Sequence, residues 1–128
     1  MELIAVDGAT FLQDDPNVVC TITPSGVPSI TCKAEGAGML LDGYQVIVSA
    51  ITYPSAGATI PDPVSYPAAF ITSAAKVKAD GTLVLLEGDL TATISATPQI
   101  PNSPSPIPYP ITFKIEIKAA GQTKVKAV

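Results

Sequence analysis

The 128-residue sequence contains no histidine, arginine or tryptophan, and its only cationic side chains are seven lysines. Without histidine, the chain lacks the general base of Ser-His and Cys-His catalytic pairs, and we predict that it is not an enzyme and has no catalytic residues. Seven lysines and a net charge of −4 are too few to neutralise a run of phosphates, so no nucleic-acid partner is expected.

Long apolar runs are also missing, although the mean hydropathy is positive at +0.39. Asp42, Lys76 and Glu87 interrupt the most apolar stretches, and no run reaches the 18 or so residues of a membrane span. The first 15 residues carry acids and no basic residue, which is not the pattern of a secretory leader. We therefore expect synthesis and folding in the cytoplasm.

Cysteine is scarce, with Cys20 and Cys32 as the only two. They flank Pro24-Ser25-Gly26 almost symmetrically and could be neighbours across a hairpin, so a disulfide is geometrically conceivable. In a reducing cytoplasm, thiols are favoured over a disulfide.

The residues that are abundant favour an all-β fold. The chain is 47% hydrophobic but only 5% aromatic, with 13 prolines and 9 glycines. Most apolar residues are Ala, Val, Ile or Leu alternating with Thr, Ser and Lys, which is typical of strands separated by frequent turns. The length predicts a single domain, residues 1–128.

A repeat with a period near 45 residues organises the chain. TCKAEGAGMLLDG (31–43) aligns without a gap on KVKADGTLVLLEG (76–88), which matches Gly36 with Gly81 and Gly43 with Gly88. In the second copy, Asp80-Gly81 between alternating runs is a strong hairpin signal.

A third copy is split between the two termini. KVKAV (124–128) matches the opening strand of the repeat, and AVDGATFLQDD (5–15) resembles ADGTLVLLEGD (79–89). This alignment predicts that Gly8, Gly36 and Gly81 occupy three equivalent turns and that strand 124–128 lies beside the N-terminal segment. The chain would then form a closed pseudo-threefold body with few exposed strand edges.

Alternation along the repeated strands assigns their two faces, because successive side chains on a strand point to opposite sides. The residues predicted to face inward, near the pseudo-axis, are Cys32, Val77 and Val125. The residues predicted to face outward are Lys33, Lys78 and Lys126.

A small all-β repeat body with this glycine signature resembles the PAAR and PAAR-like proteins. The residues that carry the resemblance are Val77, Gly81, Val84, Gly88 and Asp89. It implies a compact cone whose base sits on the blunt end of a trimeric β-helical spike, of the VgrG or phage type, in a contractile injection machine such as a type VI secretion system.

Several expectations follow from the resemblance. The protein would be a non-enzymatic tip that caps and sharpens the spike, one copy per spike trimer, and a monomer when free. It would be assembled into a phage tail or secretion particle, delivered outward, and would contact the target membrane transiently. The residues that dock on the spike are not predicted.

The sequence departs from the family at its apex and at its name-giving tetrapeptide. Leu83-Val84-Leu85-Leu86 stands where Pro-Ala-Ala-Arg would fall. Many family members bind zinc through three histidines and one cysteine, and a chain without histidine cannot supply that ligand set. We therefore expect no metal site and no cofactor.

Two other features are interpreted as structural. Asp42 and Glu87 precede glycines at matching repeat positions and are predicted to be solvated turn acids. The Pro-rich segments 53–67 and 97–110 could be polyproline ligands, but their repetition favours extended segments along the outside of the body.

An alternative function is an Ig-like or decorating β domain of an adhesin or virion surface. Ig-like sandwiches have about seven strands in Greek-key order and no reason for a 45-residue period with a unit split across the termini. The repeat therefore favours the spike tip.

Overall fold

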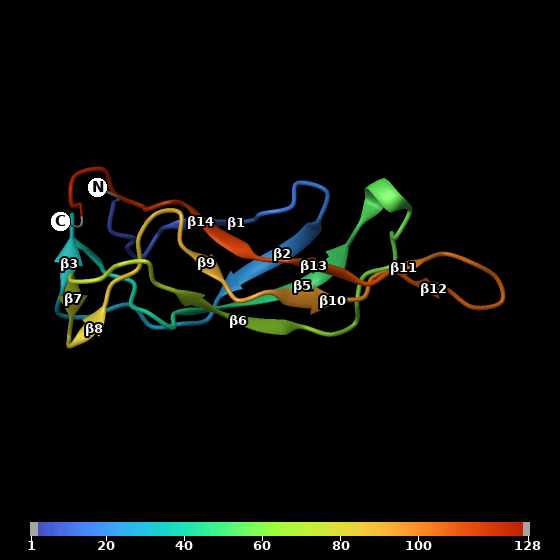
Figure 1. Ribbon diagram of the computed structural model, residues 1–128, viewed down its shortest axis with the longest axis horizontal. Coiled ribbons are helices and arrows are strands. Elements are labelled where there is room, and N and C mark those ends of the chain that lie inside the picture. The colour runs from blue at the N-terminus through green and yellow to red at the C-terminus, as the bar shows by residue number, and fades with distance from the viewer. Residues whose placement is uncertain (1–2, 127–128) are drawn as a thin grey trace.

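The computed structural model describes residues 3–126, which form short β-strands and one 3-10 helix and contain no α-helix (Figure 1). The elements are β1 (Thr10–Gln13), β2 (Val19–Pro24), β3 (Lys33–Ala34), β4 (Ala37–Gly38), β5 (Gln45–Thr52), η1 (Pro54–Ala56), β6 (Tyr66–Ile71), β7 (Lys78–Ala79), β8 (Thr82–Leu83), β9 (Leu90–Thr91), β10 (Ile94–Ala96), β11 (Gln99–Ile100), β12 (Ile107–Pro108), β13 (Ile111–Phe113) and β14 (Ile115–Ala119). The fold is all-β, as the composition predicted.

Six strands form an antiparallel sheet in the order β1-β14-β9-β6-β5-β2. The two outer strands of this order, β1 and β2, also contact each other. The side-chain amide of Gln13, in β1, donates to the carbonyl oxygen of Val18 just before β2, at 2.5 Å. The sheet is therefore nearly closed on itself, which leaves little exposed strand edge.

The main core lies inside this sheet and is formed by the side chains that alternate inward along the strands. In β5, Val46 and Val48 are fully buried, Gln45 and Ile47 are exposed, and Ser49 is half-buried. The alternation shifts by one at Ala50, whose φ of +52° is left-handed, so that Ile51 is again buried. Phe70 and Phe113 both pack in this core. Burial of each such side chain contributes about 1.5–3 kcal/mol.

A ring of backbone hydrogen bonds joins three segments that are far apart in the sequence. Ala5 N donates to Leu85 O at 2.9 Å, Leu85 N to Leu40 O at 2.8 Å, and Leu40 N to Ala5 O at 2.9 Å. All three residues are completely buried. Each segment therefore donates to one of the others and accepts from the remaining one. We call residues 3–7, 38–42 and 83–87 the central ring.

A second cycle of backbone bonds surrounds the first. Each of its bonds runs from the last residue of one ring segment to the first residue of the next, at 2.8 Å. The three bonds are Asp7 N to Gly38 O, Asp42 N to Leu83 O, and Glu87 N to Leu3 O.

The ring corrects the predicted placement of Gly8. Gly8, Gly43 and Gly88 have φ values of +100°, +87° and +93°, and each is the third residue of a four-residue turn that follows its ring segment. A positive φ at that position suits a type II turn and favours glycine. Gly8 is thus in register with Gly43 and Gly88 and not with Gly36 and Gly81. Acid-glycine pairs mark both kinds of turn, so the alignment chose the wrong one.

The Pro-rich segments do not run along the outside of the body, as the sequence suggested. Residues 53–65, with η1, and 97–110, with β11 and β12, lie together at one end of the molecule (Figure 1). Ile60 pairs with Gln99, and the rings of Tyr53 and Tyr109 lie 5.6 Å apart. Each segment therefore buries side-chain surface against the other.

We expect Leu85→Ala to lower the free energy of unfolding by about 2–5 kcal/mol, because it leaves a cavity where the three ring segments meet. Urea denaturation followed by circular dichroism measures the change. The control is Leu12→Ala on β1, whose side chain is 45% exposed and should lose roughly 0.5 kcal/mol. Equal losses for the two variants would contradict the packing of the ring.

Candidate functional site

Two hairpins and the segments near the two termini form one end of the molecule, which we call the hairpin end (residues 3–4, 30–38, 74–83 and 122–126). The hairpins are β3–β4 and β7–β8. Figure 1 shows them beside both chain termini, at the opposite end from β11, β12 and η1. The hairpin end therefore brings the two repeated hairpins together with the bridge of Leu3 and Lys126.

Both hairpins turn through an acid-glycine pair. Glu35 and Gly36 have φ values of +51° and +83°, and Asp80 and Gly81 have values of +52° and +79°. Positive φ at both central residues defines a type I′ turn, which matches the twist of the flanking strands. The hairpin predicted at Asp80-Gly81 is confirmed.

Residues 125–126 pair with residues 3–4 as the first strand of each hairpin pairs with the second. Lys126 forms an antiparallel bridge with Leu3. Three further backbone bonds of 3.0–3.1 Å connect equivalent residues of the repeat. Ile4 N donates to Val125 O, Met39 N to Cys32 O, and Val84 N to Val77 O. Val125 therefore lies beside the N-terminal segment as predicted; residues 127 and 128 are outside the described range.

The three residues predicted to face inward gather in one small apolar cluster. Cys32, Val77 and Val125 are half-buried, and all three pack against a core of Ile4, Ala79, Val84 and Leu86. This cluster is separate from the main core inside the sheet. Lys33, Lys78 and Lys126 are exposed.

The turn acids of the two hairpins bind neighbouring segments of the chain. The Asp80 carboxylate accepts hydrogen bonds from the hydroxyls of Ser29, at 2.6 Å, and Thr31. These bonds, from Ser29 first and Thr31 second, hold the pKa of Asp80 below its usual range. Glu35 Oε2 accepts from Thr123 N at 3.0 Å. Both hairpins are thus tied to the segments that lead into other strands.

Gln122 ties residues 124–125 to the ring, and the sequence offered no signal for it. Its side chain is buried and forms four hydrogen bonds of 2.7–2.8 Å. Nε2 donates to Ile4 O and Val125 O, while Oε1 accepts from the amides of Lys124 and Val125. A glutamine can satisfy donors and acceptors on both sides at once.

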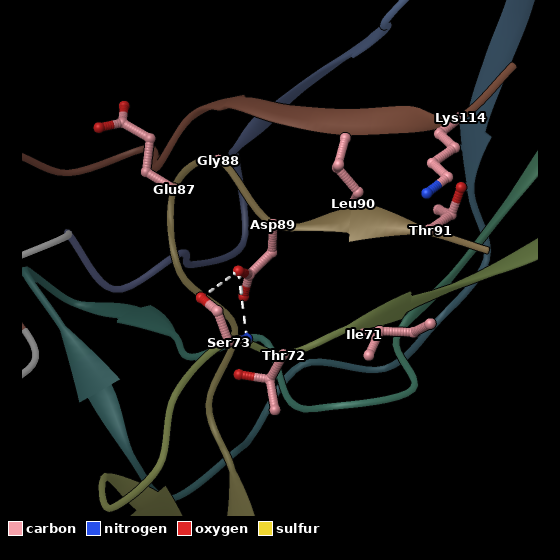
Figure 2. Close-up of a pocket in the computed structure, with 9 residues that line it drawn as sticks. All are labelled: Ile71, Thr72, Ser73, Glu87, Gly88, Asp89, Leu90, Thr91 and Lys114. Carbon is pink, nitrogen blue, oxygen red and sulfur yellow. Dashed lines mark hydrogen bonds between the residues drawn. The ribbon is translucent and has the colours of Figure 1, made fainter. Parts of the chain in front are cut away.

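Asp89, a residue of the glycine signature, supports the turn at Gly88. Its side chain is buried; Oδ1 accepts from Ser73 Oγ at 2.6 Å, and Oδ2 accepts from Leu86 N at 2.7 Å. Figure 2 shows the Ser73 and Asp89 side chains pointing toward each other, while Glu87 points away from them. Because both carboxylate oxygens accept hydrogen bonds from the chain, Asp89 has a structural role.

An open depression of about 520 Å³ lies beside this turn, and Thr91 and Lys114 line its far side (Figure 2). The Thr91 hydroxyl donates to Ala92 O and accepts from Ile115 N. Among residues 3–126, every buried side-chain nitrogen and oxygen atom has a hydrogen-bond partner. The depression therefore offers no unpaired buried group to a ligand.

The predicted turn acids lie where the ring joins the sheet. Asp42 is exposed, and its Oδ1 accepts from Thr72 N at 3.0 Å; Glu87 is half-buried. Asp7 occupies the matching position before Gly8. Within the described part of the chain, no three His, Cys, Asp or Glu side chains lie close enough together to hold a metal ion.

The two cysteines are free thiols in different clusters, so they are not bonded across a hairpin. Cys20 packs against the main core, where burial raises the pKa of its thiol. Cys32 belongs to the cluster at the hairpin end.

At the opposite end, Asp62 connects the two Pro-rich segments. Its buried carboxylate accepts from Tyr66 Oη at 2.6 Å, Thr97 N at 2.8 Å and Val64 N at 2.9 Å. Burial alone would raise the pKa of Asp62, but the three hydrogen bonds outweigh it and lower the pKa. The bond to Asp62 raises the pKa of Tyr66 to about 12.

No family model, curated protein or solved structure matches this chain. Residues 3–126 include no helix with the length and apolar character needed to cross a membrane.

We expect Tyr66→Phe to lower the free energy of unfolding by about 1–2 kcal/mol at pH 7, because Asp62 loses a donor to its charged form. Because the pKa of Asp62 is lowered in the folded state, its hydrogen bonds stabilise the fold fully above the unfolded pKa of about 3.9. This stabilisation is lost as the pH falls through the folded pKa. The difference between wild type and variant should therefore shrink below about pH 4.

The raised pKa of Tyr66 acts in the other direction. The bond from the Tyr66 hydroxyl stabilises the fold fully below the unfolded pKa of about 10, and this stabilisation is lost as the pH rises toward about 12. Urea denaturation between pH 2 and 11 measures both limbs. Tyr109→Phe is the matched control, since no hydrogen bond of the Tyr109 hydroxyl occurs among the described residues. A constant Tyr66→Phe difference over this range would contradict the network.

Proposed function

We propose that this protein is a non-enzymatic tip that caps the blunt end of a trimeric β-helical spike in a contractile injection machine. In this proposal it is a pseudo-threefold cone, one copy binds each spike trimer, and the chain is monomeric when free. The observation that carries the proposal is the pair of hydrogen-bond cycles in the central ring, in which residues 3–7, 38–42 and 83–87 play interchangeable roles.

The sheet supports the same symmetry. The strands follow one another around the sheet in three pairs: β1 with β2, β5 with β6, and β9–β10 with β13–β14. Each pair is joined to the next by hydrogen bonds, through β2–β5, β6–β9 and β14–β1. The third hairpin would be the one split between the termini, at the bridge of Leu3 with Lys126.

Matching symmetry is what a cap on a trimer needs. A trimeric β-helix ends in three identical chains, each with unpaired backbone groups. A partner with one binding copy would satisfy one chain and leave the other two exposed at a cost of about 1–3 kcal/mol for each buried unpaired group. Three near-equivalent copies in one chain can cover all three at once.

The hairpin end is the better candidate for the docking surface, because only there are the three copies alike. At the opposite end, the connections have very different lengths: residues 14–18, 53–65 and 97–110. Three unequal loops cannot form three similar contacts. We therefore place the spike at the hairpin end and the target membrane at the Pro-rich end.

The Pro-rich end has the character of a piercing apex. Segments 53–65 and 97–110 contain nine of the 13 prolines, which restrict the backbone. Their only charged residue is Asp62, which is buried. These two long connections therefore expose no charged side chain, which avoids the cost of moving an ion into lipid.

The strand order does not favour the alternative of an Ig-like adhesin or virion domain. Neighbouring strand pairs follow the chain around the sheet, whereas an Ig-like sandwich has two sheets with Greek-key connections.

Circular permutation tests the ring. Four residues separate the bridged pair Lys33 and Gly38, and four separate Lys78 and Leu83. Joining Val128 directly to Met1 also leaves four residues between Lys126 and Leu3. We expect a permutant joined in this way, and opened between Glu35 and Gly36, to keep a cooperative unfolding transition.

Val128→Asp with Met1→Gly at the junction should raise its melting temperature, since aspartate and glycine suit a type I′ turn. The matched control is a permutant opened between Leu40 and Leu41, inside the ring, which should not fold. Thermal denaturation followed by circular dichroism compares them. If both permutants unfold alike, the chain does not close through a third hairpin.

Capture of the spike tests the function. The tagged chain, expressed together with the trimeric β-helical spike of its own injection machine, should co-purify with it at one copy per three spike chains by native mass spectrometry. Deleting residues 123–128 should abolish folding and capture together, because it removes Val125 from the hairpin end. Asp42→Asn with Glu87→Gln should preserve both. A stable trimer of the chain alone, or no capture of the spike, would refute the proposal.

A further inference from the structure

Positive charge is concentrated at the hairpin end. Five of the seven lysines lie there, namely Lys33, Lys76, Lys78, Lys124 and Lys126. Glu35 and Asp80 are the only carboxylates among the described residues of this end, so three positive charges are in excess. All five lysines are exposed.

The rest of the described chain has the opposite sign. It contains eight carboxylates and two lysines, Lys114 and Lys118. Lys118 is already paired with Glu116 at 3.0 Å. The molecule is therefore polarised along its length, with an acidic body and a cationic end, although its net charge is negative.

Three of the five lysines occupy matching positions in the three copies of the repeat. Each directly follows one of the half-buried residues Cys32, Val77 and Val125. Each also bridges to the first residue of a ring segment: Lys33 to Gly38, Lys78 to Leu83, and Lys126 to Leu3. The backbone thus places Lys33, Lys78 and Lys126 equivalently around the central ring.

These three lysines have no partner among the described residues. The ion pairs there join Lys118 to Glu116 and Lys124 to Glu35, the latter at 4.0 Å. Asp80, on the β7–β8 turn, is occupied by Ser29 and Thr31. The charges of Lys33, Lys78 and Lys126 are therefore available to a binding partner.

We infer that the partner's docking face is acidic, with at least one carboxylate from each chain of a trimer facing Lys33, Lys78 and Lys126. This inference rests on the proposed spike-capping function and adds the chemistry that would select the spike. A trimer has one copy of each acidic residue per chain, so a single carboxylate position in its sequence supplies three partners around its axis. Charge complementarity of this kind increases the association rate and excludes wrong partners.

The exposed apolar residues of this region do not share that symmetry. Val27 and Ile30 are 78% and 80% exposed, but both lie in the connection between β2 and β3. The residues at matching positions before Val77 and Val125, in 72–75 and 120–123, include no exposed residue larger than threonine. An apolar contact through Val27 and Ile30 could reach one spike chain only, whereas the lysines can reach all three.

The experiment measures binding of the full-length chain to the spike trimer isolated by co-purification. Lys33→Gln, Lys78→Gln and Lys126→Gln together should weaken the affinity roughly tenfold to a hundredfold at low salt, since each exposed ion pair contributes roughly two- to fivefold. Most of the loss should fall on the association rate, and the dependence of affinity on salt should become shallower. Circular dichroism checks that the variant is folded.

A matched pair of double variants separates position from net charge. Lys33→Gln with Lys78→Gln and Lys114→Gln with Lys118→Gln change the net charge equally, but only the first pair should weaken binding. Wild-type chain should not bind vesicles containing phosphatidylserine, or duplex DNA, at 150 mM salt.

The possible failures are distinguishable. Capture of the spike that is insensitive to salt and to all three lysine substitutions overturns the inference and leaves the capping function intact. If the lysine substitutions weaken binding to the anionic vesicles or to DNA but do not weaken binding to the spike, the inference is also overturned, in favour of a phosphate partner. Failure of the wild-type chain to capture a spike at any salt concentration overturns the capping function and the inference together.

Discussion

The structure depends on how three chain segments satisfy their backbone amides in a space that side chains have closed to water. Ala5, Leu40 and Leu85 are completely buried, and each amide finds its acceptor on another of the three segments. A buried amide without a partner would cost about 1–3 kcal/mol, so the loss of one segment would leave unpaired groups on the other two. The nearly closed sheet, the two hairpins and the bridge of Leu3 with Lys126 all extend from these three segments.

Much of this arrangement could be predicted from the sequence because its signals are local. Asp80-Gly81 marks a type I′ turn whatever surrounds it, and the 45-residue spacing then locates the first hairpin from the second. The pairing of the C-terminal strand was predicted by the same repeat. Gly8 was misplaced because a type II turn and a type I′ turn both favour glycine after an acid. Only the hydrogen bonds of the ring distinguish the two turns.

The groups that hold the two ends together could not be predicted. Gln122 donates a hydrogen bond to Ile4, 118 residues away, and nothing in the neighbouring sequence indicates a buried glutamine. Asp62 lies in a Pro-rich segment, where an acid is normally exposed, and it is charged and buried only because donors from Tyr66 and Thr97 reach it. Such long-range contacts have no periodicity, so a single sequence does not reveal them. The Pro-rich segments were misplaced for the same reason, since their packing depends on each other.

The repeated and unrepeated parts of the chain solve different problems. In the proposed cap, the β3–β4 hairpin, the β7–β8 hairpin and the Leu3–Lys126 bridge would present three similar surfaces to a threefold partner, and this requires short strands with little variation. The apex of such a cap would have the opposite requirement, because three identical loops would meet around the axis and none could cross it. With connections as unequal as residues 14–18, 53–65 and 97–110, the longest can extend past the others, as the β11–β12 hairpin does in Figure 1. In the proposed cap, similar surfaces at one end and unequal loops at the other would both follow from closing a single chain around one axis.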